Sequence, residues 1–186
     1  MLFRSDLPAS RALRHAARGV AFAAKDALAK AKEEQQLFEA TRAKVPADFA
    51  MGQNPMSSIN EIAAHLLAGE ILYREKQEDA GIAELRKAVE AEDRLKYDEP
   101  PDWILPTRHA LGAALTQSKK YKEAEAVFRE DLRRIPGNGW SLFGLGRALR
   151  LQGNNAEADK VDGQFKEVWS KADLQLQSAC MCQSGR

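Results

Sequence analysis

An internal repeat of 34 residues constrains the fold of this chain more than any other feature of its sequence. The residues that recur 34 positions apart are Leu111 with Leu145, Gly112 with Gly146, Leu115 with Leu149, and Ala124 with Ala158. A period of this length, with small and large apolar residues at helical spacing, is typical of a unit built from two antiparallel helices. One such unit cannot bury its apolar face alone, so we expect an all-α protein in which successive helical hairpins stack.

Two further copies of the pattern lie upstream at longer offsets. At an offset of 43 residues the pairs are Gly69 with Gly112, Leu72 with Leu115, Gly81 with Ala124, and Leu85 with Phe128. At a further offset of 50 residues the pairs are His15 with His65, Gly19 with Gly69, Phe22 with Leu72, and Ala31 with Gly81. The most N-terminal copy is degenerate, because Leu37 and Phe38 miss the position that Phe128 occupies. The sequence therefore predicts three to four units, and an offset of 43 instead of 34 implies nine inserted residues.

The unit that starts at Leu105 resembles the tetratricopeptide repeat (TPR) family. That family's pattern runs Trp, Leu-Gly, Tyr, Ala, Phe and Pro, and the matching residues here are Leu111, Gly112, Leu115, Ala124, Phe128 and Pro136, with Arg108 in place of the Trp. The unit that starts at Gly139 keeps the pattern through Ala158, but Asp162 stands where Phe is expected. The resemblance implies a right-handed solenoid of helical hairpins, whose first helices line a concave groove for partner segments.

Several stretches are also similar to longer bacterial tetratricopeptide proteins of unassigned role. These stretches are RHAARGVAFAA, AAHLLAGE, YDEPPDW, REDLRRIPGNGWSLFGLGRALRLQG and the closing Cys-x-Cys. This similarity implies that the chain is the C-terminal part of a longer array, and it assigns no reaction.

Local signals predict the domain organisation. We expect a degenerate hairpin over residues 1–46, a linker over 47–57, three repeats over 58–172 with a loop insertion near 92–103, and a C-terminal tail over 173–186. Ser58 to Glu61 reads as a capping box that opens a helix. In the insertion, Trp103 can anchor the loop onto the helices as a structural strap. The alternative is an acidic docking loop over one end of the groove.

Composition limits the classes of partner. Lys and Arg number 28 against 27 for Asp and Glu, so no net charge draws the whole chain toward nucleic acid or an anionic membrane. No apolar run is long enough to span a bilayer, and only two cysteines occur. These features predict a cytoplasmic protein. The alternative is organelle targeting, because residues 1–24 are rich in arginine and nearly free of acids.

Helical periodicity predicts which side chains face the groove. The candidate partner-binding residues are Tyr73, Arg74, His109, Trp140, Phe143, Arg147 and Arg150, and Ala113, Thr116 and Gln117 share their face. Aromatic residues and arginine dominate binding energy at protein interfaces, and arginines one helical turn apart can hold carboxylates. We therefore expect a protein partner that presents an acidic segment or a C-terminal carboxylate. In the alternative interpretation, Trp140 and Phe143 pack against the preceding unit and the arginines are solvated.

The chain end offers a second possible chemistry. Cys180 and Cys182 flank a methionine, and two thiolates with a thioether suit Cu(I), Zn(II) or reversible oxidation. No further ligands at metal-site spacing accompany them in the sequence. The sequence contains no phosphate-binding loop, nucleophile elbow or His-Glu-x-x-His motif. We therefore predict a non-catalytic interaction scaffold without a cofactor, with a metal- or redox-responsive helical protein as the alternative.

Overall fold

The computed structural model describes residues 7–182, and over these residues it contains eight α-helices and one two-stranded sheet. The prediction of an all-α class is confirmed. The chain divides into two compact units, with the boundary between Leu105 and Pro106 at the end of the predicted insertion. The stretch 47–57, which we expected to be a linker, lies inside the first unit. Residues 1–6 and 183–186, which belong to the predicted first hairpin and tail, lie outside the described residues.

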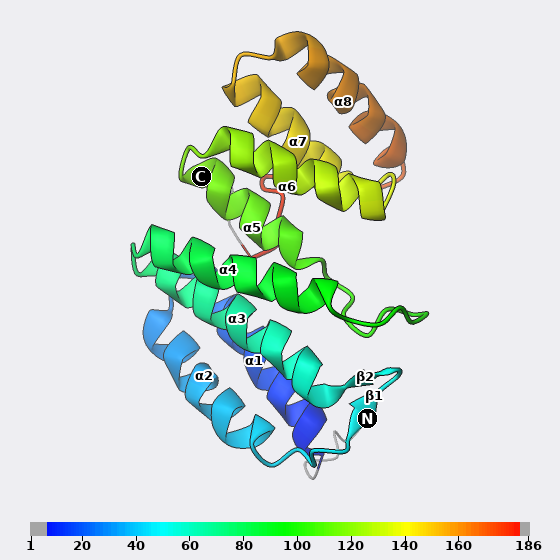
Figure 1. The fold of residues 1–186 in the computed structure, drawn as a ribbon. Helices are drawn as coiled ribbons and strands as arrows, with labels where there is room; N and C mark the ends of the chain where they lie inside the picture. Colours follow the sequence, from blue (N-terminus) through cyan, green and yellow to red (C-terminus); the bar gives the residue numbers. More distant parts are fainter. Residues whose placement is uncertain (1–6, 183–186) are drawn as a thin grey trace. The chain divides into compact units, whose positions relative to one another are not determined.

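The first unit consists of two helical hairpins (Figure 1). Its helices are α1 (Pro8–Ala24), α2 (Leu28–Arg42), α3 (Met56–Arg74) and α4 (Glu78–Asp93). Helix α1 packs on α2, α3 packs on α4, and α3 also packs on α1 and α2. The fully buried Phe38 forms a core cluster with Ala12, Ala16 and Ala63. Trp103 packs against this cluster, which confirms that it anchors the loop after α4 onto the helices.

The second unit has the same arrangement. Its helices are α5 (Thr107–Gln117), α6 (Tyr121–Arg134), α7 (Gly139–Leu151) and α8 (Asn155–Val168). Helix α5 packs on α6, α7 packs on α8, and α7 also packs on α5 and α6. None of the helices in residues 7–182 has the length and apolar character that a membrane span requires.

All four hairpins turn in the same way. The first residue in each set of three donates nothing unusual in sequence, yet the main-chain bonds repeat: Ala27 N to Phe22 O, Gln77 N to Leu72 O, Lys120 N to Leu115 O, and Asn154 N to Leu149 O, at 2.9 to 3.0 Å. The residues with positive φ that precede these amides are Asp26, Lys76, Lys119 and Gly153. A left-handed residue followed by such a bond is a Schellman motif, which satisfies carbonyls at a helix C-terminus. The turns lie 50, 43 and 34 residues apart, which are the offsets of the sequence repeat.

Small residues bring the two helices of a hairpin close together. A Cβ added at Gly69 of α3 would lie 2.7 Å from Cγ of Leu85 in α4. One added at Gly81 of α4 would lie 2.8 Å from the main-chain nitrogen of Tyr73. Neither position has room for a side chain, because real Cβ contacts are longer. The repeat therefore conserves space between helices as much as it conserves apolar side chains within this chain.

The stretch before α3 forms a small β-hairpin that the sequence did not predict. Strand β1 (Ala50–Met51) pairs antiparallel with β2 (Asn54–Pro55). The buried Asn54 donates from Nδ2 to the carbonyl of Lys96 at 2.9 Å and to Asp102 Oδ2 at 2.8 Å, and it accepts from the amide of Lys96 at 2.8 Å. The side chain of one residue thus ties the β-hairpin to the loop after α4.

The predicted capping box does not start α3. The helix begins at Met56, two residues before Ser58, and no side chain caps it. The amide of Met56 instead donates to the carbonyl of Phe49 at 2.9 Å. The prediction was wrong because the chain enters the helix directly from β2, so the helix N-terminus is satisfied by the β-hairpin main chain.

Candidate functional site

The candidate site lies on α5 and α7 of the second unit, which a single aromatic ring holds side by side. Phe128 of α6 is fully buried. A Cβ added at Gly112 of α5 would overlap the Phe128 ring, and so would one added at Gly144 of α7. Both helices can approach the ring only because these two positions carry no side chain. The face that α5 and α7 share is therefore fixed by one phenyl group and two glycines.

A polar network closes the same three helices at their other end. Asp131 of α6 is buried and accepts from Ser141 Oγ at 2.6 Å and from Asn138 Nδ2 at 2.7 Å. The Asn138 amide also lies 2.8 Å from Nε2 of His109, and that nitrogen lies 3.6 Å from Asp131 Oδ2. The backbone N of Trp140 donates to Asn138 Oδ1 at 3.1 Å, which caps α7. His109 is therefore held inside the helix packing.

The environment of Asp131 lowers its pKa. Burial alone raises the pKa of this carboxyl, but the interactions with His109, Ser141 and Asn138 together outweigh burial, so the pKa lies below its ordinary value of 3.8. The grouping is not a nucleophilic triad. In a triad the imidazole stands between hydroxyl and carboxylate, whereas here the Ser141 hydroxyl donates directly to Asp131. Its geometry suits the fixing of helices.

The predicted groove aromatics pack mainly on α8 and the turn that follows it. Trp140 makes an edge contact with Trp169 at 5.9 Å between ring centroids, and Phe143 lies 5.7 Å from Phe165. Phe165 and Trp169 stack at 5.5 Å. Trp140 also stacks on His109 at 6.3 Å. Of the predicted residues, His109 and Trp140 are thus brought together, while Phe143 belongs to the contact with α8.

The two predicted arginines of α7 have different partners. Arg147 is exposed, and its Nη1 donates to the main-chain carbonyl of Gln177 at 3.2 Å. Arg150 donates to Asp159 at 2.9 Å and to Asp162, both in α8. The hydrogen bonds to Asp159 and Asp162 raise the pKa of Arg150 above its ordinary value. Arg147 and Arg150 therefore do not form one clamp, and only Arg147 lies on the face shared with α5.

Tyr73 and Arg74 belong to the first unit. Tyr73 is buried at the end of α3. The mostly buried Arg74 side chain lies 3.6 Å from the carboxylate of Asp26. Both residues therefore contribute to the packing of their own unit.

The remaining histidines form a repeated pair in the first unit. His15 Nδ1 lies 2.7 Å from Glu34, and His65 Nδ1 lies 2.7 Å from Glu84. Both pairs link the two helices of one hairpin, and their members are 50 residues apart in the sequence. Burial raises the pKa of Glu84, but Lys87 and His65 together lower it below its ordinary value. These imidazoles hold hairpins together through carboxylates.

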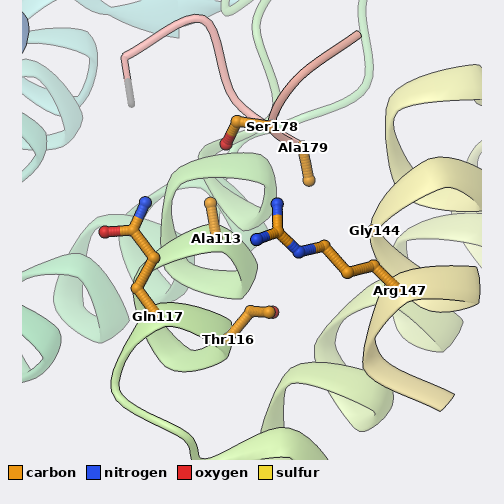
Figure 2. A pocket seen from close by; sticks show the side chains of 7 residues that line it. All are labelled: Ala113, Thr116, Gln117, Gly144, Arg147, Ser178 and Ala179. Atoms are coloured by element: carbon orange, nitrogen blue, oxygen red, sulfur yellow. The ribbon is translucent and has the colours of Figure 1, made fainter. Parts of the chain in front are cut away.

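A small pocket lies where α5, α7 and the C-terminal tail meet (Figure 2). Its lining residues are Ala113, Thr116 and Gln117 of α5, Gly144 and Arg147 of α7, and Ser178 and Ala179 of the tail. Figure 2 shows the Arg147 side chain reaching from α7 toward Ala113 and Ala179. The hydroxyl of Thr116 donates to the carbonyl of Gly112 at 2.8 Å, so it is used within its own helix. The pocket therefore offers small apolar surfaces and one guanidinium.

Sequence reasoning found part of this pocket. Ala113, Thr116, Gln117 and Arg147 all lay on the predicted groove face. The tail residues Ser178 and Ala179 were missed because the tail has no helical periodicity to place it. Gly144 was missed as a lining residue because its repeat position carries Ala110 in the preceding unit, which gives no sign of a close approach.

Cys180 and Cys182 are joined to each other by a disulfide. In this form neither sulfur is a thiolate, and a thiolate is what Cu(I) and Zn(II) bind. Within either unit alone, the described residues bring no three His, Cys, Asp or Glu side chains together as ligands for an ion. Reduction would be needed before the pair could bind metal.

The chain was compared with known proteins in three ways. No family model, no curated protein and no solved structure matches it.

Proposed function

We propose that this chain is a tetratricopeptide-type array that binds a segment of another protein on the face formed by its first helices. Three features support the repeat assignment: equivalent Schellman turns at offsets of 50, 43 and 34 residues, the space left at Gly69 and Gly112, and helix packing in which each hairpin contacts the next one within a unit. The right-handed solenoid and the bacterial, cytoplasmic setting are part of this proposal.

The single observation that carries the binding proposal is the α5–α7 face. Small residues line it, and the exposed Arg147 stands at its edge with donors directed over it. Arginine binds carboxylates and main-chain carbonyls through fixed, planar donors. An acidic segment or a C-terminal carboxylate remains the partner chemistry we propose. The expectation now rests on Arg147 alone, because Arg150 is engaged by Asp159 and Asp162.

The test begins with a library of random peptides displayed with free C-termini. The library is selected on the immobilised chain, and binding of the selected peptides is measured by fluorescence anisotropy. We expect peptides with carboxylates to be enriched. Arg147→Gln should weaken their binding about tenfold, the loss of about 1.4 kcal/mol. The matched control is Arg14→Gln, which changes an exposed arginine of α1 in the other unit. Equal weakening by both variants would contradict a role for the α5–α7 face.

A redox-responsive tail is the second candidate function, and the disulfide favours it. A dithiol reductant would supply two electrons and two protons, so that the sulfur–sulfur bond breaks, Cys180 and Cys182 become thiols, and the reductant becomes a disulfide. The test measures peptide binding with and without the dithiol, using a chain with Cys180→Ser and Cys182→Ser as the control. A change on reduction that the control does not show would support this function, and identical binding in all cases would remove it.

A further inference from the structure

The C-terminal tail already lies on the face that we propose for partner binding. The carbonyl of Gln177 accepts from Arg147, and Ser178 and Ala179 line the pocket with α5 and α7. Ser178 and Ala179 are only 7% and 5% exposed. A segment without regular secondary structure is thus held by the exposed arginine of α7 and by small residues of both helices.

The contacts do not depend on an elaborate sequence in the tail. Arg147 binds a main-chain carbonyl, which every residue of an extended segment carries. The pocket around Ala113 and Gly144 receives the small side chain of Ala179. Another segment with a small residue next to a carbonyl could make the same contacts. The tail is therefore a replaceable occupant of this face.

The start of the tail is held separately from its end. Trp169 Nε1 donates to the carbonyl of Leu174 at 2.7 Å, and Trp169 in turn packs on Trp140. Only residues 175 and 176 separate this anchor from Gln177. A tether this short raises the effective concentration of the attached segment, typically to about millimolar. An untethered peptide that binds the same face must compete with that concentration.

We propose that the tail segment 177–182 is an intramolecular occupant of the α5–α7 face, so that a partner segment binds by displacing it. This inference rests on the proposed function and adds its regulation: the free affinity of the face exceeds the affinity that the intact chain displays. The segment that competes best should resemble the tail, with a small residue beside the carbonyl that Arg147 binds.

The experiment uses the full chain and a chain that ends at Gln175, which keeps the contact between Trp169 and Leu174. The probe is a fluorescein-labelled peptide of residues 175–182 in its oxidised form. We expect the shortened chain to bind the probe at least tenfold more tightly than the full chain. In the shortened chain, Arg147→Gln should weaken binding about tenfold and Arg14→Gln should leave it unchanged.

A second variant avoids truncation. In the full chain, Ala179→Trp places a large ring in a pocket lined by Ala113 and Gly144, so the tail should be displaced and the probe should bind as it does to the shortened chain. Far-UV circular dichroism checks that both variants are folded. Equal binding of the probe to the full chain, the shortened chain and Ala179→Trp would overturn the inference, and so would no binding to any of them.

Two further outcomes separate this inference from the proposed function. Library peptides that bind the full and the shortened chain equally would support the function and overturn the inference. A shortened chain that binds its own tail peptide but selects no library peptide would support the inference and remove the function. If the full chain dimerises and the shortened chain does not, the occupant is the tail of a second copy, and the intramolecular proposal is overturned.

Discussion

The hairpins α5–α6 and α7–α8 share a repeat register but fill their interiors differently. Each has a glycine at the point where its helices approach, Gly112 in one and Gly146 in the other. Opposite Gly112 stands the buried ring of Phe128. Opposite Gly146 stands the carboxylate of Asp162, which Arg150 binds. One hairpin thus closes through an apolar contact and the other through an ion pair at its surface.

The difference shows which part of the repeat determines the hairpin. The turn and the small residues are present in both pairs of helices, so they are sufficient to set the geometry. The large residue opposite the glycine is replaceable, provided that apolar area is buried elsewhere. In α7–α8 that area comes from the aromatic contacts of Phe143, Phe165 and Trp169. The same backbone can therefore be stabilised at either end of a hairpin.

The comparison breaks most clearly at Phe128. Phe128→Ala should lower the free energy of unfolding by about 3 to 5 kcal/mol, because it empties the space between Gly112 and Gly144. Urea unfolding of the full chain, followed by far-UV circular dichroism, measures the loss. A loss below about 1 kcal/mol would mean that the ring is not the centre of the packing.

The buried carboxylate gives the next largest effect. Asp131→Asn should lower the free energy of unfolding by about 2 kcal/mol at neutral pH, since it removes a charged acceptor from Ser141 and Asn138. The folded-state pKa of Asp131 is lowered, so its contribution is present above the ordinary value of 3.8 and is lost as the pH falls through the folded-state pKa. The difference between the two proteins should therefore shrink in urea titrations carried out below that pH.

The exposed Asp159 provides the control for this prediction. Asp159→Asn should leave the free energy of unfolding nearly unchanged across the same pH range. A pH dependence equal to that of Asp131→Asn would assign the effect to general surface charge.

Glycine substitutions sharpen the comparison. Gly112→Ala and Gly144→Ala should each lower the free energy of unfolding, because overpacking against Phe128 costs about 1 to 3 kcal/mol and the gain in helix propensity returns only about 1. Gly146→Ala should cost less, since the Asp162 side chain can move. Gly163 of α8 has no atom near the position of a Cβ, so Gly163→Ala should stabilise the protein by about 0.5 to 1 kcal/mol. Stabilisation by all four would show that the close approaches are absent.

The smallest expected effect concerns the turns. Lys119 and Gly153 occupy equivalent left-handed positions. Lys119→Gly should stabilise the chain by roughly 0.5 kcal/mol, because the left-handed strain of a side chain exceeds the extra entropy that glycine loses on folding. Gly153→Lys should destabilise it by a similar amount, about 0.5 kcal/mol. Thermal melting of both variants measures the two shifts, and shifts of equal sign would contradict the equivalence of the turns.

The sequence predicted the features that recur and missed those that occur once. Repeat offsets located every hairpin turn within residues 7–182, because a Schellman turn follows from where the apolar positions end. They also located the close approach of Gly112 to Phe128. The β-hairpin at Ala50–Pro55 was missed because its strands are two residues long and leave no alternating pattern. Its position depends on the side chain of Asn54, which no local pattern announces.

The candidate site was predictable only where it lies on helices. Periodicity placed Ala113, Thr116 and Arg147 on one face, and the pocket brings them together. It also placed Trp140 and Phe143 there, although both aromatics pack against residues of α8 or of the turn after it. Phe165 and Trp169 lie off the repeat pattern, so nothing in the sequence indicated that they would meet those rings. The choice among faces of a helix depends on partners distant in sequence.

The hydrogen bonds of Asn54 have a consequence for the order in which the first unit folds. They join Asn54 to Lys96 and Asp102, which are 42 and 48 residues further along the chain. The helical hairpins close over much shorter separations, and local contacts form faster than distant ones. During synthesis on a ribosome, we therefore expect α1–α2 and α3–α4 to assemble first, while the β-hairpin waits until the loop beyond α4 has emerged from the exit tunnel.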